Sequence, residues 1–308
     1  MSVSTTEKLV PRPPFSESTT DLILRSSDGI DFHVYRVVLC LASSVFRDMV
    51  GLAQPEDENM PTVRMAESGV VLDRILRFWY PGSEPVVENL GQLREILELL
   101  IDKYDVKAVV PVGKQFLRGY IESQPVGVFA VAARHGWEDL AFSAAQESLR
   151  LPLRSSSYRP PDELKYVSGI IHHSLIQYHY RCGEAARKAC VCFIQSPPNW
   201  AYKLFDCTCT THSDVTVWFF DYVHSFGDLV ALTPSDRNAH DLMAKALKEA
   251  TKCKTCSGAA HDGFPSFVSI KLLPLLAAKI AEVNLNLNGL GENDVPRSAP
   301  ARIRKPRF

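Results

Sequence analysis

The sequence lacks the short motifs that usually identify an enzyme. It contains no glycine-rich dinucleotide fingerprint, no phosphate loop, no serine nucleophile elbow and no His-Glu-x-x-His zinc motif. His172, His173 and His179 fall on one predicted helix without nearby carboxylates, so we interpret them as surface or satisfied core histidines. The minor alternative is a hydrolase or metal pair built on these histidines. The absence of the usual motifs predicts no catalytic residues and a protein that is not an enzyme.

Signals for secretion and membrane insertion are also missing. The first fifteen residues contain three prolines and no apolar run of the kind that forms a signal peptide, and no Asn-x-Ser/Thr acceptor occurs. The apolar segment from Ile270 to Val283 is interrupted by two lysines and a proline, and we expect it to be too short for a bilayer. We therefore expect an intracellular protein of the cytoplasm or nucleus that does not associate with a membrane. Its eight cysteines should be reduced thiols or metal ligands.

Neither sign of charge dominates. The chain has 34 Lys and Arg residues against 35 Asp and Glu residues, so its net charge of -1 gives no global attraction to nucleic acid and favours a protein partner. The last twenty residues, 289–308, are predicted to form a flexible basic tail. This tail could touch nucleic acid or act as a weak nuclear import signal, but its prolines favour a solvated end. Its cations are Arg297, Arg302, Arg304, Lys305 and Arg307.

The first part of the chain alternates short strands with short helices. Leucines at 22 and 24 precede the turn Asp28-Gly29 and a second alternating segment from Ile30 to Val34, which predicts a β-hairpin. Two short helices with Ser43 or Ser44 as a cap should follow. Apolar spacing then predicts a strand over Thr62–Met65 and helices over Val70–Tyr80, Leu90–Tyr104 and Val106–Ile121.

The segment DLILRSSDGIDFHVYRVVLCLASSVFRDMV resembles the opening of a BTB/POZ domain. Later segments resemble the third strand, the next helix and the last helices of that family, and the likeness covers roughly Ser18 to Ile121. It implies an α+β fold in which a small mixed sheet packs on a helical cluster. The sequence departs from the family at Tyr35, where histidine is usual, and in an acid- and proline-rich stretch before Thr62. The residues that carry the resemblance are Asp21, Asp28, Gly29, Phe32, Arg36, Leu39, Ser44, Phe46, Met49 and Tyr104.

The rest of the chain is predicted to be all-α. Two helices before residue 154 are similar to the helical segment that often follows a BTB domain, and the Ser/Pro-rich loop 155–161 is the favoured boundary. Further helices are expected over Ile170–Phe193, Asp214–Leu232, Asp236–Cys253 and Phe264–Leu287. We divide the chain into a flexible lead (1–17), a BTB/POZ domain (18–121), trailing helices (122–154), a helical carboxy-terminal region with paired cysteines (162–288) and the tail (289–308).

Two cysteine pairs in the helical region suggest a structural metal. Cys207-x-Cys209 and Cys253-x-x-Cys256 flank two predicted helices, each roughly 25 to 28 Å long. If these helices pack antiparallel, the pairs meet at one end, where four thiolates could bind zinc tetrahedrally in a closed, non-catalytic site. The alternative is that they are ordinary loop and helix-end thiols. The other cysteines, Cys40, Cys182, Cys190 and Cys192, are predicted to lie in the core.

The resemblance implies a protein-interaction adaptor or scaffold that forms a homo-oligomer, such as a homodimer, and recruits another protein. In many relatives that protein is a cullin, which makes a ubiquitin-ligase substrate adaptor one alternative. The stretch GLAQPEDENMP shows no clean match to the hydrophobic-x-Glu motif of cullin-binding members. The chain resembles instead BTB proteins of fungi that carry a helical tail with paired cysteines. A nucleic-acid-binding regulator that uses the cysteine site and the tail is the other alternative, disfavoured by the net charge.

Overall fold

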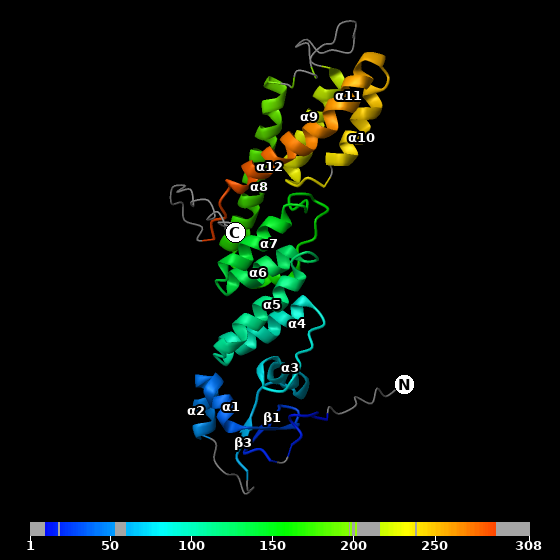
Figure 1. Cartoon of the computed structure of the whole chain (residues 1–308). Coiled ribbons are helices and arrows are strands. Elements are labelled where there is room, and N and C mark those ends of the chain that lie inside the picture. The colour runs from blue at the N-terminus through cyan, green and yellow to red at the C-terminus, as the bar shows by residue number, and fades with distance from the viewer. Residues whose placement is uncertain are drawn as a thin grey trace, which may run out of the picture. The chain divides into compact units, whose positions relative to one another are not determined.

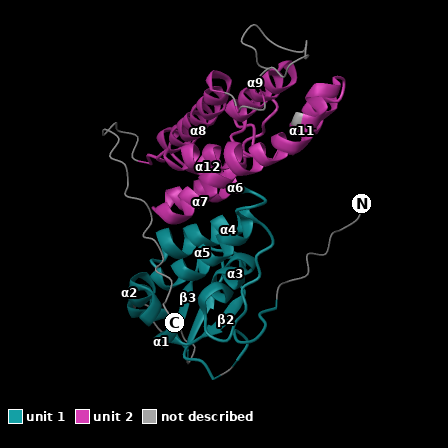
Figure 2. Ribbon diagram, turned by 45° about the horizontal axis from the view of Figure 1, so that its top comes forward, with its two compact units in different colours: residues 1–124 teal, residues 125–308 magenta. Residues whose placement is uncertain are grey.

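The computed structural model divides the chain into two compact units, residues 1–124 and residues 125–308 (Figure 2). We call them unit 1 and unit 2 and describe each by itself. The residues that the structure describes are 10–17, 19–52, 60–196, 198, 201, 216–237 and 239–287.

Unit 1 contains the small mixed sheet that the sequence predicts. Strands β1 (Leu22–Arg25) and β2 (Asp31–Val34) form an antiparallel hairpin, and β3 (Thr62–Arg64) adds to the other edge of β1 in parallel, giving the order β2-β1-β3. Gly29 has a φ of 78° in the hairpin turn, a conformation that glycine adopts without a steric cost. The alternating apolar residues of β1 and β2 are buried, which confirms the predicted hairpin.

Short helices make up the rest of unit 1 (Figure 1). Ser43 separates the first two helices, and its hydroxyl accepts a 3.0 Å hydrogen bond from the main-chain N–H of Phe46, so Ser43 is the cap that the sequence left undecided. Asn89 caps the fourth helix by accepting from the N–H of Gln92 at 2.9 Å. The helices are α1 (Arg36–Ala42), α2 (Ser44–Leu52), α3 (Gly69–Trp79), α4 (Leu90–Leu97) and α5 (Val110–Tyr120), with a π-helical turn, η1 (Glu98–Lys103), and a 3-10 turn, η2 (Lys107–Val109).

The end of the amino-terminal lead belongs to the fold of unit 1. Phe15 is fully buried, and its ring makes edge-on contacts with Phe32 at 6.1 Å and with Tyr80 at 5.2 Å between centroids. The main-chain N–H of His33 donates to the carbonyl oxygen of Phe15 at 3.0 Å. The fold therefore begins before residue 18, and the expectation of a flexible lead through residue 17 was wrong for these last residues.

Unit 2 is helical throughout the part that the structure describes. Helix α10 runs back alongside α9 (Figure 1), and the two contribute with α8 and the later helices to one apolar core that includes Phe219, Phe226 and Phe264. The elements are α6 (Pro125–Arg134), α7 (Glu138–Ser148), η3 (Asp162–Tyr166), α8 (Gly169–Gln195), α9 (Val217–Leu232), α10 (Ala239–Ala250), α11 (Lys254–Phe267), η5 (Val268–Leu272) and α12 (Leu273–Ala281). The structure assigns the helices before the 155–161 loop to the same unit as those after it.

The last helical segment is longer than the sequence predicts. It begins at Lys254, ten residues before the expected start, and continues through a π-helical turn to Ala281. Within the described residues, Ala260–Ala281 is the one helix long and apolar enough to cross a membrane, with a mean hydropathy of 1.5. The expectation that this segment is too short was therefore wrong. Core helices of soluble proteins meet the same criterion, and Phe264 and Leu272 of this helix are buried in the core of unit 2.

Candidate interaction surfaces of the first unit

Helix α1 exposes an apolar stripe. Val37 is 59% and Leu41 79% exposed, and the two lie one turn apart on the same face of the helix. Leu39, on the opposite face, is completely buried. The start of the helix is fixed because the carboxylate of Asp21 accepts a 2.7 Å hydrogen bond from the main-chain N–H of Arg36. We call Val37 and Leu41, together with the partly exposed Tyr35 that precedes them, the α1 face.

Asp28, one of the residues that carry the family resemblance, joins the hairpin turn to α3. Its Oδ1 accepts a hydrogen bond from the hydroxyl of Ser26 at 2.5 Å and another from the main-chain N–H of Gly69 at 2.8 Å. There is no room for a side chain at Gly69, because a Cβ would collide with Ile30. Asp28 and Gly29 therefore fix the local fold.

The other residues of the resemblance are mostly core residues. Phe32 and Phe46 are buried, and Met49 is half-buried on the inner side of α2. The exposed Ser44 donates from its hydroxyl to the carboxylate of Asp105 at 2.9 Å. The structure thus distributes these residues through unit 1 and does not gather them into a single site.

Tyr104 anchors a buried polar network that the sequence did not reveal. Its ring stacks on Phe46 with 4.7 Å between centroids, and its hydroxyl donates to the carboxylate of Glu67 at 2.5 Å. Lys103 also donates to Glu67. Burial alone raises the pKa of Glu67, but the hydrogen bonds from Lys103 and Tyr104 outweigh it and hold the pKa below its ordinary value of 4.5. Burial and the bond to Glu67 together raise the pKa of Tyr104.

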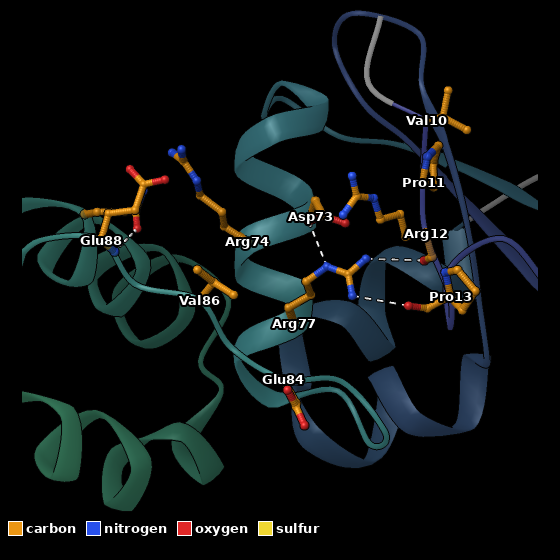
Figure 3. Close-up of a pocket in the computed structure, with 11 residues that line it drawn as sticks. Val10, Pro11, Arg12, Pro13, Asp73, Arg74, Arg77, Glu84, Val86 and Glu88 are labelled. Carbon is orange, nitrogen blue, oxygen red and sulfur yellow. Dashed lines mark hydrogen bonds and ion pairs between the residues drawn. The ribbon is translucent and has the colours of Figure 1, made fainter.

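A groove of about 800 Å³ crosses the outer side of α3 (Figure 3). Helix α3 forms its floor, the end of the lead forms one wall, and the loop between α3 and α4 forms the other. We call it the α3 groove. It is lined by Val10, Pro11, Arg12, Pro13, Asp73, Arg74, Arg77, Glu84, Val86, Glu88 and Gln92.

Arg77 holds one wall of the α3 groove in place. Its guanidinium donates to the carboxylate of Asp73 at 2.9 Å and to the carbonyl oxygens of Pro13 and Arg12 at 3.2 and 3.3 Å. It also lies over the ring of Phe15, with 5.2 Å from Cζ to the centroid. Figure 3 shows these bonds joining α3 to the lead. The buried Phe15 and the bonds of Arg77 therefore hold the lead in place as one wall of the α3 groove.

The proposed zinc site lies partly outside the described residues. Cys207 and Cys209 are not among them, so the predicted meeting of the two cysteine pairs stays a prediction. Cys253 is half-buried at the start of α11, and Cys256 is buried in the core of unit 2. Among the residues that the structure describes, no group of three or more His, Cys, Asp or Glu residues could hold a metal ion.

The remaining cysteines divide into two kinds. Cys182 and Cys190 are buried as predicted, and burial raises the pKa of each thiol to about 12. Cys192 is exposed, with its thiol donating to the carbonyl oxygen of Lys188 at 3.3 Å, and Cys40 is only partly buried. The prediction of a core position was wrong for Cys192. It lies two residues after the buried Cys190, which places it on the opposite side of α8, facing solvent.

The three histidines of α8 do not form a cluster. His172 and His173 are exposed, whereas His179 is fully buried and its Nε2 donates to the carbonyl oxygen of Leu151 at 2.9 Å. His172 and His173 are the surface histidines that the sequence predicts. His179 is a core histidine that is satisfied only at Nε2, because its buried Nδ1 has no hydrogen-bond partner among the described residues. The five cations of the basic tail, 289–308, lie outside the described residues.

Sequence comparison identifies the first unit. The family model described as BTB/POZ domain matches residues 14–120, and no curated protein matches the chain. The match begins four residues before the expected start and so includes Phe15, in agreement with its burial. Unit 1 of this chain is therefore a BTB/POZ domain, a protein-interaction module with a small three-stranded sheet, and it is followed by an all-helical region.

Proposed function

We propose that the protein is an adaptor or scaffold that self-associates through the α1 face of its BTB/POZ domain. BTB/POZ domains mediate self-association and binding to other proteins. The observation that carries the proposal is the exposure of Val37 and Leu41 on one face of a helix whose other face is buried. Exposed apolar side chains that lie together are typical of protein interfaces.

The energetics of α1 favour a second copy as the occupant of this face. Burying a Val or Leu side chain contributes about 1.5 to 3 kcal/mol, and a two-fold interface buries each residue twice. Two turns of one helix therefore supply a useful part of the free energy of a dimer. Tyr35 adds an aromatic ring with a polar end beside the stripe.

The molar mass of the full-length protein in solution tests this proposal. Light scattering after size-exclusion chromatography should give a multiple of the 34.4 kDa chain mass for the wild type and a lower mass for Leu41→Glu. The matched control is Ile270→Glu, which charges an apolar side chain that is 70% exposed in unit 2. A wild-type protein that is monomeric at all concentrations, or a Leu41→Glu protein of unchanged mass, contradicts the role of the α1 face.

The adaptor role requires that the self-associated protein bind a second, different protein. Affinity purification of the tagged full-length protein, followed by mass spectrometry with stoichiometry, distinguishes the versions of this role. Recovery of a cullin with its RING partner supports a ubiquitin-ligase adaptor. Recovery of the chain itself with signalling or chromatin proteins supports a scaffold without a role in degradation, in the cytoplasm or nucleus.

A further inference from the structure

We propose that the α3 groove binds an extended peptide of another protein and recognises one carboxylate side chain in it. The groove goes beyond the proposed self-association, because a single copy of unit 1 forms it and it contains no residue of the α1 face. The proposal rests on the hydrogen-bond donors that the groove leaves unused, on its unpaired main chain and on its rim charges.

Two donors in the groove have unused hydrogen-bonding capacity. Arg74 is half-buried on the floor, and its guanidinium has no partner among the residues that the structure describes. Gln92 is only 9% exposed, and its Oε1 accepts from the main-chain N–H of Glu88 at 2.8 Å, which leaves its amino group as a donor. A guanidinium and an amide N–H both donate to acceptors, and among peptide side chains a carboxylate is the acceptor whose negative charge also pairs with the guanidinium.

The wall opposite the lead offers main-chain groups to an extended peptide. Val86 and Val87 lie outside helices and strands, and within the described part of the chain no group pairs with their main-chain N–H or C=O. Main-chain groups without protein partners can bond to the backbone of an extended peptide, while side-chain contacts give specificity. Val86 and Val10, 69% and 75% exposed on opposite walls, supply apolar contacts for neighbouring side chains of the peptide.

The charges of the groove restrict the sequence of the peptide. Arg77 is already bonded to Asp73 and to the lead, so Arg74 is the cation left for the ligand on the floor. The exposed Arg12 is a second cation, on the wall that the lead forms. In Figure 3 the side chain of Arg74 extends from α3 toward the wall that carries Glu88. Glu84 and Glu88 are exposed carboxylates on this wall and repel further acidic residues. The peptide should therefore place one carboxylate at Arg74 and have uncharged or basic residues where it faces Glu84 and Glu88.

A paired peptide library on the full-length protein tests the proposal. The probes are N-acetylated, C-amidated decapeptides with a central Glu and flanks drawn from uncharged and basic residues, each made also with a central Gln. The expected result is a set of Glu peptides that bind at least ten times more tightly than their Gln partners by isothermal titration calorimetry. Ten-fold corresponds to about 1.4 kcal/mol, just below the lower end of what a hydrogen bond to a charged group contributes.

Variants then locate the binding site. Arg74→Gln should abolish the preference for Glu, whereas the control Arg187→Gln, which removes a half-exposed guanidinium from α8, should leave it unchanged. Leu41→Glu should also bind the peptides normally, which separates this proposal from self-association. The proposal is overturned if no Glu peptide is preferred over its Gln partner, or if Arg74→Gln retains the preference.

Discussion

Tyr104 and Glu67 meet in the interior of unit 1, where the tyrosine hydroxyl donates a 2.5 Å hydrogen bond to Oε2 of the glutamate. The contact links the end of η1 to the segment between β3 and α3, thirty-seven residues away in the chain. The carbonyl oxygen of Tyr104 also accepts from the hydroxyl of Ser43, which caps α2. One residue therefore ties three parts of the BTB/POZ domain together.

Removing the hydroxyl group of Tyr104 should destabilise the protein. Tyr104→Phe keeps the stacking on Phe46 but takes one donor from a buried carboxylate, which costs about 1 to 3 kcal/mol. The free energy of unfolding in urea, followed by circular dichroism, measures the loss. Tyr120→Phe, which removes a hydroxyl from a half-buried tyrosine of α5, is the control and should change stability by less than about 0.5 kcal/mol. Equal effects of the two substitutions would contradict the role of the Glu67 contact.

His179 should make unit 2 sensitive to mild acid. Burial lowers the pKa of His179 below its ordinary value of 6.5, and the nearby Arg154 adds to this effect. The unfolded chain takes up the proton first, so the contribution of neutral His179 to stability is complete above about pH 6.5 and is lost as the pH falls below that value. The midpoint temperature of thermal unfolding should therefore decrease as the pH is lowered from 7 to 5.5.

The matched variant for this prediction is His179→Gln. Glutamine does not titrate and retains an N–H for the carbonyl oxygen of Leu151. Its unfolding midpoint should therefore depend less on pH over the same range than that of the wild type. Identical pH profiles for the two proteins would show that another group controls the acid response.

Gly183 allows α8 and α9 to approach each other closely. A Cβ at this position would collide with the main-chain carbonyl of Ala231, and backbone cannot move aside as a flexible side chain can. Gly183→Ala should therefore lower the free energy of unfolding by about 1 to 3 kcal/mol. Gly258→Ala in α11 is the opposite case, because a Cβ there meets open space, and it should stabilise the helix by up to about 1 kcal/mol. Chemical denaturation measures the free energy of unfolding of both variants. An unchanged value for Gly183→Ala would refute the steric argument.

Phe15 should contribute as much as a central core residue despite its place near the amino terminus. Phe15→Ala removes a fully buried ring and should cost roughly 3 to 5 kcal/mol in the free energy of unfolding. Val10→Ala, which truncates a mostly exposed side chain of the same lead, should change it by less than about 0.5 kcal/mol. If both variants unfold like the wild type, the lead does not pack as the structure describes.

Local patterns were sufficient to predict the hairpin and most helices. The alternation around Asp28-Gly29 gave β1 and β2, and apolar spacing gave α3 and α8 to within a few residues. The start of α11 was missed because Gly258, Gly263 and Pro265 weaken the helical pattern, although the segment folds as a helix against the core of unit 2. Tertiary packing there overrides local propensity.

The candidate surfaces could not be predicted from the sequence. Val37 and Leu39 are both apolar residues of α1, yet one is exposed and the other is buried, since only the packed fold decides which side of a short helix faces the core. Arg74 and Arg77 are likewise equivalent by residue type. Arg77 reaches the carbonyl groups of the lead, whereas Arg74 is left without a partner among the described residues, and this difference defines the α3 groove.

Resemblance to a known family gave the family of the first unit from the sequence alone. The sequence also determined its strands and the helical character of the rest, because turn residues and hydrophobic periodicity are local properties of the chain. Tertiary structure alone decided which apolar side chains stay exposed on α1, that the lead closes one wall of a groove, and that Glu67 is buried with two donors. These features depend on contacts between residues thirty or more positions apart, whose distances no local pattern sets.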